Sequence, residues 1–241
     1  MIVRMLLAAL AAGLIAGLAM TPAQYTKLVP LILEAETYES MPAADEAAGE
    51  TEHVHADGHE HGEESVLGFG RLGNTILANI AAGGGFALLL AGTAMLIGLN
   101  FPQGGEGVKR GLMLGAAAWF AVQLAPGWGL PPELPGFPYV DLVERQIWWL
   151  AAVVLSAGGI YLIALRPEWI AKVTGVALIV APHLYGAPQP ADISSDVPAF
   201  LASEYTTASL ATTLFFWLLL GGLLGFFLSR VDDGDAVAQA G

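Results

Sequence analysis

Residues 210–228 read LATTLFFWLLLGGLLGFFL, an uninterrupted apolar run in which no side chain carries a charge. A helix needs about 20 consecutive apolar residues to cross the hydrocarbon core of a bilayer, and this run has that length and composition. Polar residues return at Ser229 and Arg230, directly after it. The segment therefore predicts a membrane-spanning helix.

Five further apolar blocks precede this run. They are Val3–Met20, Ile76–Leu99, Gly111–Ala125, Ile147–Leu165 and Trp169–Pro182. Of the 241 residues, 55% are hydrophobic and 13% are charged, whereas a soluble domain carries about 25% charged residues. We therefore expect an all-α fold: a polytopic integral membrane helical bundle of about six spans, forming a single domain over residues 1–241. Five spans are possible, because the block Trp169–Pro182 is short.

The first block permits a second interpretation. Arg4 followed by small apolar residues resembles the start of a signal peptide. The apolar character resumes at Leu28–Leu33, beyond the usual length of a signal core, and this favours a retained span. Pro22 and Pro30 are expected to kink this helix or to split it from an interfacial segment.

The basic residues predict the orientation of the bundle, because cytoplasmic loops carry an excess of Lys and Arg. Six spans with a cytoplasmic N-terminus place these residues inside: Arg4, Lys109, Arg110, Arg166, Lys172 and Arg230. The outside segments then hold Lys27, Arg71 and Arg145. Both termini are therefore expected in the cytoplasm, and the long loop after the first span is expected outside.

This long loop, residues 37–70, is polar and acidic, and we expect it to be flexible. It contains His53, His55, His59 and His61, two His-x-His pairs interleaved with carboxylates, and neutral imidazole binds borderline metals such as Co²⁺, Ni²⁺, Cu²⁺ and Zn²⁺. The pattern favours a metal-collecting loop. A flexible loop imposes no fixed geometry, so it should not select one of these metals. The alternative is a solvated acidic linker whose histidines are incidental.

Three further residues are candidate metal ligands. His183 is the only histidine outside the loop, and the prolines around it are expected to break the helix there. Glu34 and Glu36 follow an apolar run on the same outer side, so the three could form one vestibule beneath the loop. The alternatives are an interfacial histidine bonded to a neighbouring helix, and two hydrated carboxylates that mark the membrane surface.

Small and polar residues suggest how the helices contact one another. The Gly-x-x-x-Gly pairs Gly13/Gly17, Gly111/Gly115 and Gly221/Gly225 would let helix backbones approach closely, although glycine abundance alone could produce them. Asn74, Asn79 and Gln123 are expected to bond between helices rather than to line a path. Arg145 is expected to pair with Glu133 or Asp141.

Several functional classes are excluded or disfavoured. The absence of cysteine excludes disulfides, iron–sulfur clusters and thiolate metal sites. The sequence contains no phosphate-binding Gly-x-x-x-x-Gly-Lys-Ser/Thr motif and no catalytic set, so we do not expect an enzyme. The net charge of −13 argues against a nucleic-acid partner.

Several strings, in this order, resemble the CbtA family of predicted cobalt transporter proteins. They include Val29-Pro30-Leu31-Ile32-Leu33-Glu34-Ala35-Glu36, the histidine loop, Leu130-Pro131-Pro132-Glu133-Leu134-Pro135-Gly136, Arg145-Gln146-Ile147-Trp148-Trp149, and Pro182-His183-Leu184-Tyr185-Gly186-Ala187-Pro188-Gln189-Pro190. The resemblance covers nearly the whole chain. It implies a multi-pass subunit of a cobalt importer in the inner membrane, linked to vitamin B12 synthesis. That family is usually described with five spans.

The resemblance also implies a partner, a small single-span protein of the CbtB-like kind. We expect the other partners to be the lipid bilayer and a divalent metal ion. Cobalt(II) would be cargo, and no cofactor is expected to stay bound permanently. The metal would pass from the loop to Glu34, Glu36 or His183 and then inward through the bundle. The rival function is a non-transporting sensor or accessory protein that only concentrates metal for a partner. A polar path through the bundle would favour transport, whereas a dry core would favour the rival function.

Overall fold

The computed structural model describes residues 2–39, 70–138 and 140–240, without the side chains of 39 and 232–240. Every regular element in these ranges is a helix, which confirms the all-α expectation. The elements are α1 (Ile2–Lys27), α2 (Val29–Glu39), α3 (Gly70–Leu96), α4 (Gly105–Trp119), the π-helix η2 (Phe120–Leu124), α5 (Ala125–Gly129), α6 (Leu142–Leu165), α7 (Trp169–Tyr185) and α8 (Ala199–Ala240).

Four of these helices are long and apolar enough to cross a membrane: α1, α3, α6 and residues Ala199–Val231 of α8. The shorter α7 is also apolar. The elements α4, η2 and α5 follow one another without a gap, so residues 105–129 form one continuous rod. The helices are consistent with a membrane bundle, whereas the count of six spans stays a prediction.

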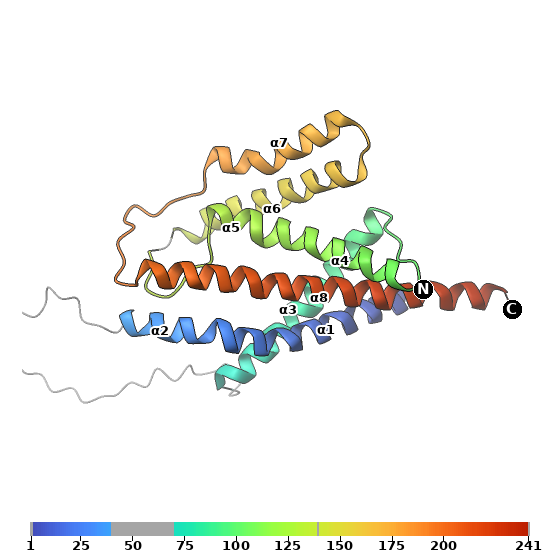
Figure 1. Ribbon diagram of the computed structural model, residues 1–241, viewed down its shortest axis with the longest axis horizontal. Helices are drawn as coiled ribbons and strands as arrows, with labels where there is room; N and C mark the ends of the chain where they lie inside the picture. The colour runs from blue at the N-terminus through green and yellow to red at the C-terminus, as the bar shows by residue number, and fades with distance from the viewer. Residues whose placement is uncertain (1, 40–69, 139, 241) are drawn as a thin grey trace, which may run out of the picture.

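The helices alternate in direction along the bundle (Figure 1). The start of α1 and the end of α8 lie at one end, which we call the terminal end. The end of α2, the start of α3 and the connections from α5 to α6 and from α7 to α8 lie at the opposite end, the loop end. The six passages are α1 with α2, α3, the rod, α6, α7 and α8, and the six-span interpretation requires that they alternate in direction.

The first helix passes Pro22 without a break, and the chain turns at Leu28 before α2 begins at Val29. Pro30 therefore stands in the first turn of α2, where its missing N–H costs nothing. The backbone bond from Ile32 N–H to the Leu28 carbonyl, at 3.0 Å, carries the chain from one helix into the other. The expected split is thus seen at Pro30 and not at Pro22.

Glycines sit at the close helix crossings. Gly13 and Gly17 of α1 meet Gly83 and Asn79 of α3, and a Cβ on either α1 glycine would overlap the α3 backbone. The same relation joins α4 to α8, through Gly107, Gly111 and Gly115 on one side and Trp217, Gly221 and Gly225 on the other. The three Gly-x-x-x-Gly pairs are therefore confirmed as contact sites. A further crossing, Gly159 of α6 on Gly175 of α7, was not expected.

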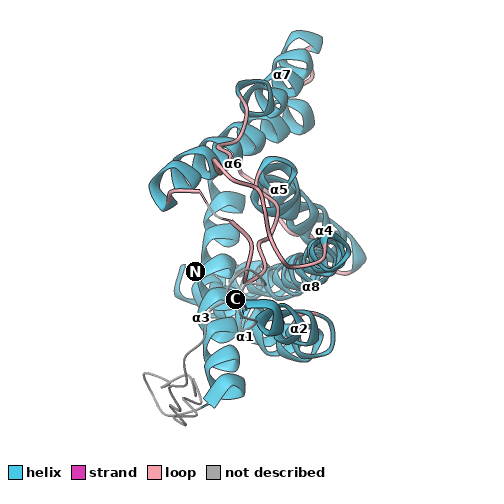
Figure 2. Cartoon of the chain, turned by 90° about the vertical axis from the view of Figure 1, so that its left-hand side faces the viewer, coloured by secondary structure: helices cyan, strands magenta, loops and turns pink. Residues whose placement is uncertain are grey.

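The main core lies where α8 packs between α1 and α4 (Figures 1 and 2). Its fully buried large side chains include Leu220, Leu224 and Leu228, which follow one another along one face of α8. The hairpin of α6 and α7 stands apart from this core and contacts it through the rod of residues 105–129 (Figure 2). The junction of hairpin, rod and α8 positions the site described next.

Candidate functional site

The histidine loop lies mostly outside the described residues, and this includes His53, His55, His59 and His61. The helices that flank it are described: α2 continues to Glu39 and α3 begins at Gly70. The described margins of the expected loop, residues 37–39 and 70, are therefore helical. Metal collection by the loop stays a prediction.

Glu36 links the two helices at the base of the loop. Its Oε1 accepts a hydrogen bond from Arg71 Nη2 at 3.3 Å, so the start of α3 is tied to α2. Both side chains are more than a third exposed, so the ion pair contributes little stability. Glu34 lies two residues earlier on α2 and is exposed. The two carboxylates therefore differ, since one is paired and the other faces the surroundings.

His183 lies in the last turn of α7, against Trp148 of α6. The two rings meet edge to face with their centroids 5.8 Å apart, and Trp148 Nε1 donates to the Pro182 carbonyl at 3.3 Å. The buried Nδ1 of His183 has no hydrogen-bond partner in the part of the chain that the structure describes. A buried polar atom in this state is costly unless something else satisfies it.

The helix break expected near His183 is present, but it lies after Tyr185 and not at Pro182. α7 continues through Pro182 and ends at Tyr185, before Gly186, whose φ of +95° suits glycine. Pro182 removes one backbone hydrogen bond near the end of the helix, and spanning helices tolerate such a loss where neighbouring helices cover the site. Trp148 covers this turn, and its Nε1 donates to the Pro182 carbonyl, which also accepts from the Gly186 backbone N–H at 3.1 Å.

Glu34 and Glu36 are not brought together with His183. α2 and α7 make no contact with each other, and Figure 2 places them on opposite sides of the bundle. No group of three or more His, Cys, Asp or Glu residues gathers among the described positions. The expected vestibule is therefore not assembled by these residues alone.

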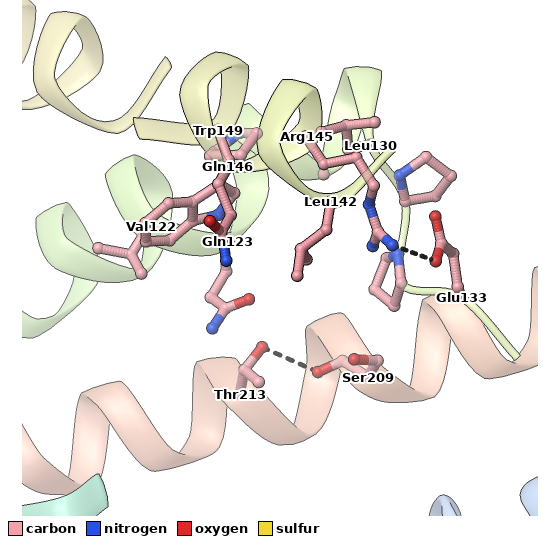
Figure 3. Close-up of a pocket in the computed structure, with 14 residues that line it drawn as sticks. Val122, Gln123, Leu130, Glu133, Leu142, Arg145, Gln146, Trp149, Ser209 and Thr213 are labelled. Carbon is pink, nitrogen blue, oxygen red and sulfur yellow. Dashed lines mark hydrogen bonds and ion pairs between the residues drawn. The ribbon is translucent and has the colours of Figure 1, made fainter. Parts of the chain in front are cut away.

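A cavity that the sequence did not predict lies between the rod, the start of α6 and α8 (Figure 3). We call it the polar cavity, and its volume is about 420 Å³. Its lining consists of Val122, Gln123, Pro126, Gly127, Leu130, Pro131, Pro132, Glu133, Leu142, Arg145, Gln146, Trp149, Ser209 and Thr213. Two amides, two hydroxyls and one ion pair thus converge among apolar helices.

Pro126 explains the irregular backbone beside this cavity. Proline has no N–H, so the rod loses one backbone hydrogen bond in its interior. The helix widens before it, and the Ala125 N–H bonds the carbonyl of Phe120, five residues back, as in a π-helix. Trp119 fixes this segment to α8, because its Nε1 lies 3.2 Å from the Leu210 carbonyl and 3.3 Å from Thr213 Oγ1.

Glu133 and Arg145 form the ion pair of the cavity. Arg145 Nη1 lies 2.9 Å from Glu133 Oε2, and each side chain is about a third exposed. This settles the partner of Arg145, since Asp141 instead caps α6 by accepting from the backbone N–H of Val143 at 2.9 Å. The pair joins the loop before α6 to the first turn of that helix.

The amides of Gln123 and Gln146 make no hydrogen bond to any other described residue. Asn79 bonds between helices as expected, since its Nδ2 donates to Thr21 Oγ1 at 3.1 Å and to Gln24 Oε1 at 2.7 Å. Gln123 does not, and the amides of Gln123 and Gln146 line the polar cavity instead (Figure 3). Unpaired amides among apolar helices are unfavourable unless water or a ligand satisfies them. Gln123 is partly buried and Gln146 is exposed, so both amides are open to water or to a hydrated ligand.

Comparison with known families gives one result. A family model described as probable cobalt transporter subunit (CbtA) matches residues 2–229, from α1 into α8. No curated protein and no solved structure matches the chain. Finer statements about function therefore rest on the residues of this chain.

Proposed function

The chain belongs to the CbtA family of probable cobalt transporter subunits, and on this premise we propose that it is the membrane subunit of a cobalt importer. In this proposal the loop of residues 37–70 collects Co²⁺ outside the cell, and the helical bundle passes the ion inward. The family match carries the proposal, because it covers nearly the whole chain and every apolar helix.

The distribution of charge supports the direction of transport. Six of the nine basic residues belong to segments at the terminal end: Arg4, Lys109, Arg110, Arg166, Lys172 and Arg230. Positive residues gather on the cytoplasmic side of membrane proteins. The loop of residues 37–70 joins α2 to α3 at the opposite end, so a cytoplasmic terminal end would place the histidines outside.

The polar cavity supports transport over the accessory alternative. A protein that only concentrates metal needs no polar space between its spanning helices. The 420 Å³ cavity instead presents amide and hydroxyl groups between the rod, the start of α6 and α8, and polar groups between spanning helices can mark substrate paths. Glu34 and Glu36 would receive metal at the base of the loop, and His183 would contact it on the α7 side.

Uptake of radioactive cobalt tests the proposed function. Cells that lack cobalt import would express the chain alone, the chain with its genomic neighbours, or the neighbours alone. We expect uptake only where the chain is present, with the highest rate when a single-span partner is co-expressed. Equal uptake with and without the chain would refute transport. Cell-bound cobalt that a chelator fully removes would instead support the accessory function.

A further inference from the structure

The polar cavity offers oxygen ligands and no imidazole. Its polar side chains are the amides of Gln123 and Gln146, the hydroxyls of Ser209 and Thr213, and the Glu133–Arg145 pair. Imidazole suits Zn, Cu, Fe and Ni, whereas carboxylate, carbonyl and water oxygens suit harder cations, of which Mg²⁺ usually keeps several waters bound. This lining is therefore suited to contact the water shell of a cation rather than the bare ion.

The size of the cavity agrees with a hydrated ion. Six water molecules at about 30 Å³ each occupy about 180 Å³, and the cavity measures about 420 Å³. A divalent cation with six waters therefore fits without losing its shell. The unpaired amides of Gln123 and Gln146 can each donate to or accept from such waters.

Glu133 is the only acidic residue of the lining, and Arg145 holds it at 2.9 Å. The pair gives the cavity no net charge, which suits a site surrounded by apolar helices. A cation that approached Glu133 would compete with the Arg145 guanidinium for the same carboxylate. A cation bound to Glu133 would leave the Arg145 guanidinium unpaired. The site would therefore hold the cation weakly and release it readily.

We propose that the polar cavity is a transit site for a hydrated divalent cation, in which Glu133 attracts the ion and Arg145 competes with it. This inference rests on the proposed transport function and names a site for it. Selection between metals does not occur here, because a retained water shell hides most differences between divalent ions.

Binding to the purified full-length chain in lipid nanodiscs tests the site. The probes are Co²⁺ and cobalt(III) hexaammine, an inert complex of similar size that cannot lose its ligands, both measured by titration calorimetry. Glu133→Gln should weaken binding of both probes at the most sensitive site by about tenfold or more. The matched control is Glu144→Gln, which removes one exposed carboxylate nearby that does not line the cavity. It should leave binding unchanged.

Arg145→Gln distinguishes two roles of Arg145: competition with the cation for Glu133, and a purely structural ion pair with Glu133. Removal of the competitor should tighten Co²⁺ binding by several-fold and lower the maximal uptake rate, because release slows. The double variant Glu133→Gln, Arg145→Gln should bind as weakly as Glu133→Gln alone. If Arg145→Gln weakens binding as Glu133→Gln does, the pair is structural and the proposal fails.

The two proposals fail in different ways. A wild-type chain that imports no cobalt with any partner would refute the transport function even if the cavity binds the hexaammine complex. A chain that imports cobalt, while Glu133→Gln and Glu144→Gln bind both probes equally, would overturn the transit site alone.

Discussion

Gly111 of α4 and Gly221 of α8 meet backbone to backbone, because a Cβ added to either would overlap the carbonyl oxygen of the other. Both positions are buried. In lipid the helices gain little from hiding apolar surface, so close packing of this kind holds them together. The crossing fixes the rod against α8, and these two elements also form two walls of the polar cavity.

Gly221→Ala should therefore destabilise the bundle. The added methyl group forces the two helices apart, and overpacking of this kind typically costs about 1–3 kcal/mol. Gly92→Ala in α3 is the matched control, because a Cβ there meets nothing within 4 Å. Thermal unfolding of the purified proteins in one detergent measures the difference. Equal midpoints for the two variants would contradict the role of this crossing.

Sequence spacing predicted glycines at two of the helix crossings, α1 on α3 and α4 on α8, but not at the third, α6 on α7. Gly13/Gly17, Gly111/Gly115 and Gly221/Gly225 repeat at four residues, which places both glycines of a pair on one helix face. Gly159 and Gly175 have no glycine four residues away, so only the packing of α6 on α7 reveals their contact. The spacing of glycines within one helix does not reveal a contact that depends on the residues of a second helix.

The polar cavity could not be predicted from sequence for a similar reason. Its lining combines residues between 122 and 149 with Ser209 and Thr213, which lie far along the chain in α8, and the widening at η2 depends on how the rod accommodates Pro126. Pro126, directly after the apolar block Gly111–Ala125 and close to Gln123, was the one signal present. At Pro182 the helix continues to Tyr185, which shows that a proline alone does not decide the local outcome.

Both termini should be cytoplasmic. The helices alternate in direction, so the start of α1 and the end of α8 share one end, and most basic residues lie there. A reporter fused after Gly241 that is active only in the cytoplasm should be active, and a periplasm-only reporter should be silent. A reporter inserted between residues 45 and 50 should give the reverse pattern. Periplasmic activity after Gly241 would rule out the six-span orientation.

Replacement of His53, His55, His59 and His61 with Ala should slow uptake far more at scarce metal than at abundant metal. A collecting loop raises the local metal concentration but does not form the path. The half-saturating cobalt concentration should therefore rise several-fold while the maximal rate changes little. The control replaces Glu46, Glu50, Glu63 and Glu64 with Gln and keeps the histidines. An equal loss at all metal concentrations would place the histidines in the path or point to a folding defect.

The last prediction concerns His183, for which the structure offers two interpretations. Its ring packs against Trp148 with centroids 5.8 Å apart, which suits a structural residue. Its buried Nδ1 has no hydrogen-bond partner among the described residues, which suits a side chain that coordinates a metal ion. Substitutions that keep one property and remove the other separate the two interpretations.

His183→Phe keeps an aromatic ring against Trp148 and removes both nitrogens, whereas His183→Gln keeps hydrogen-bonding atoms but is a far poorer ligand for a transition metal. If His183 contacts cobalt, both variants should insert and accumulate normally, and both should lose uptake even at high metal, as His183→Ala should. Uptake rate, membrane abundance and unfolding temperature would be measured together. Trp148→Phe serves as the control: it removes the indole bond to the Pro182 carbonyl and should lower stability without abolishing uptake. Normal transport by His183→Gln would show that the histidine is a hydrogen-bonding residue of the hairpin, because no metal contact would then be needed at this position.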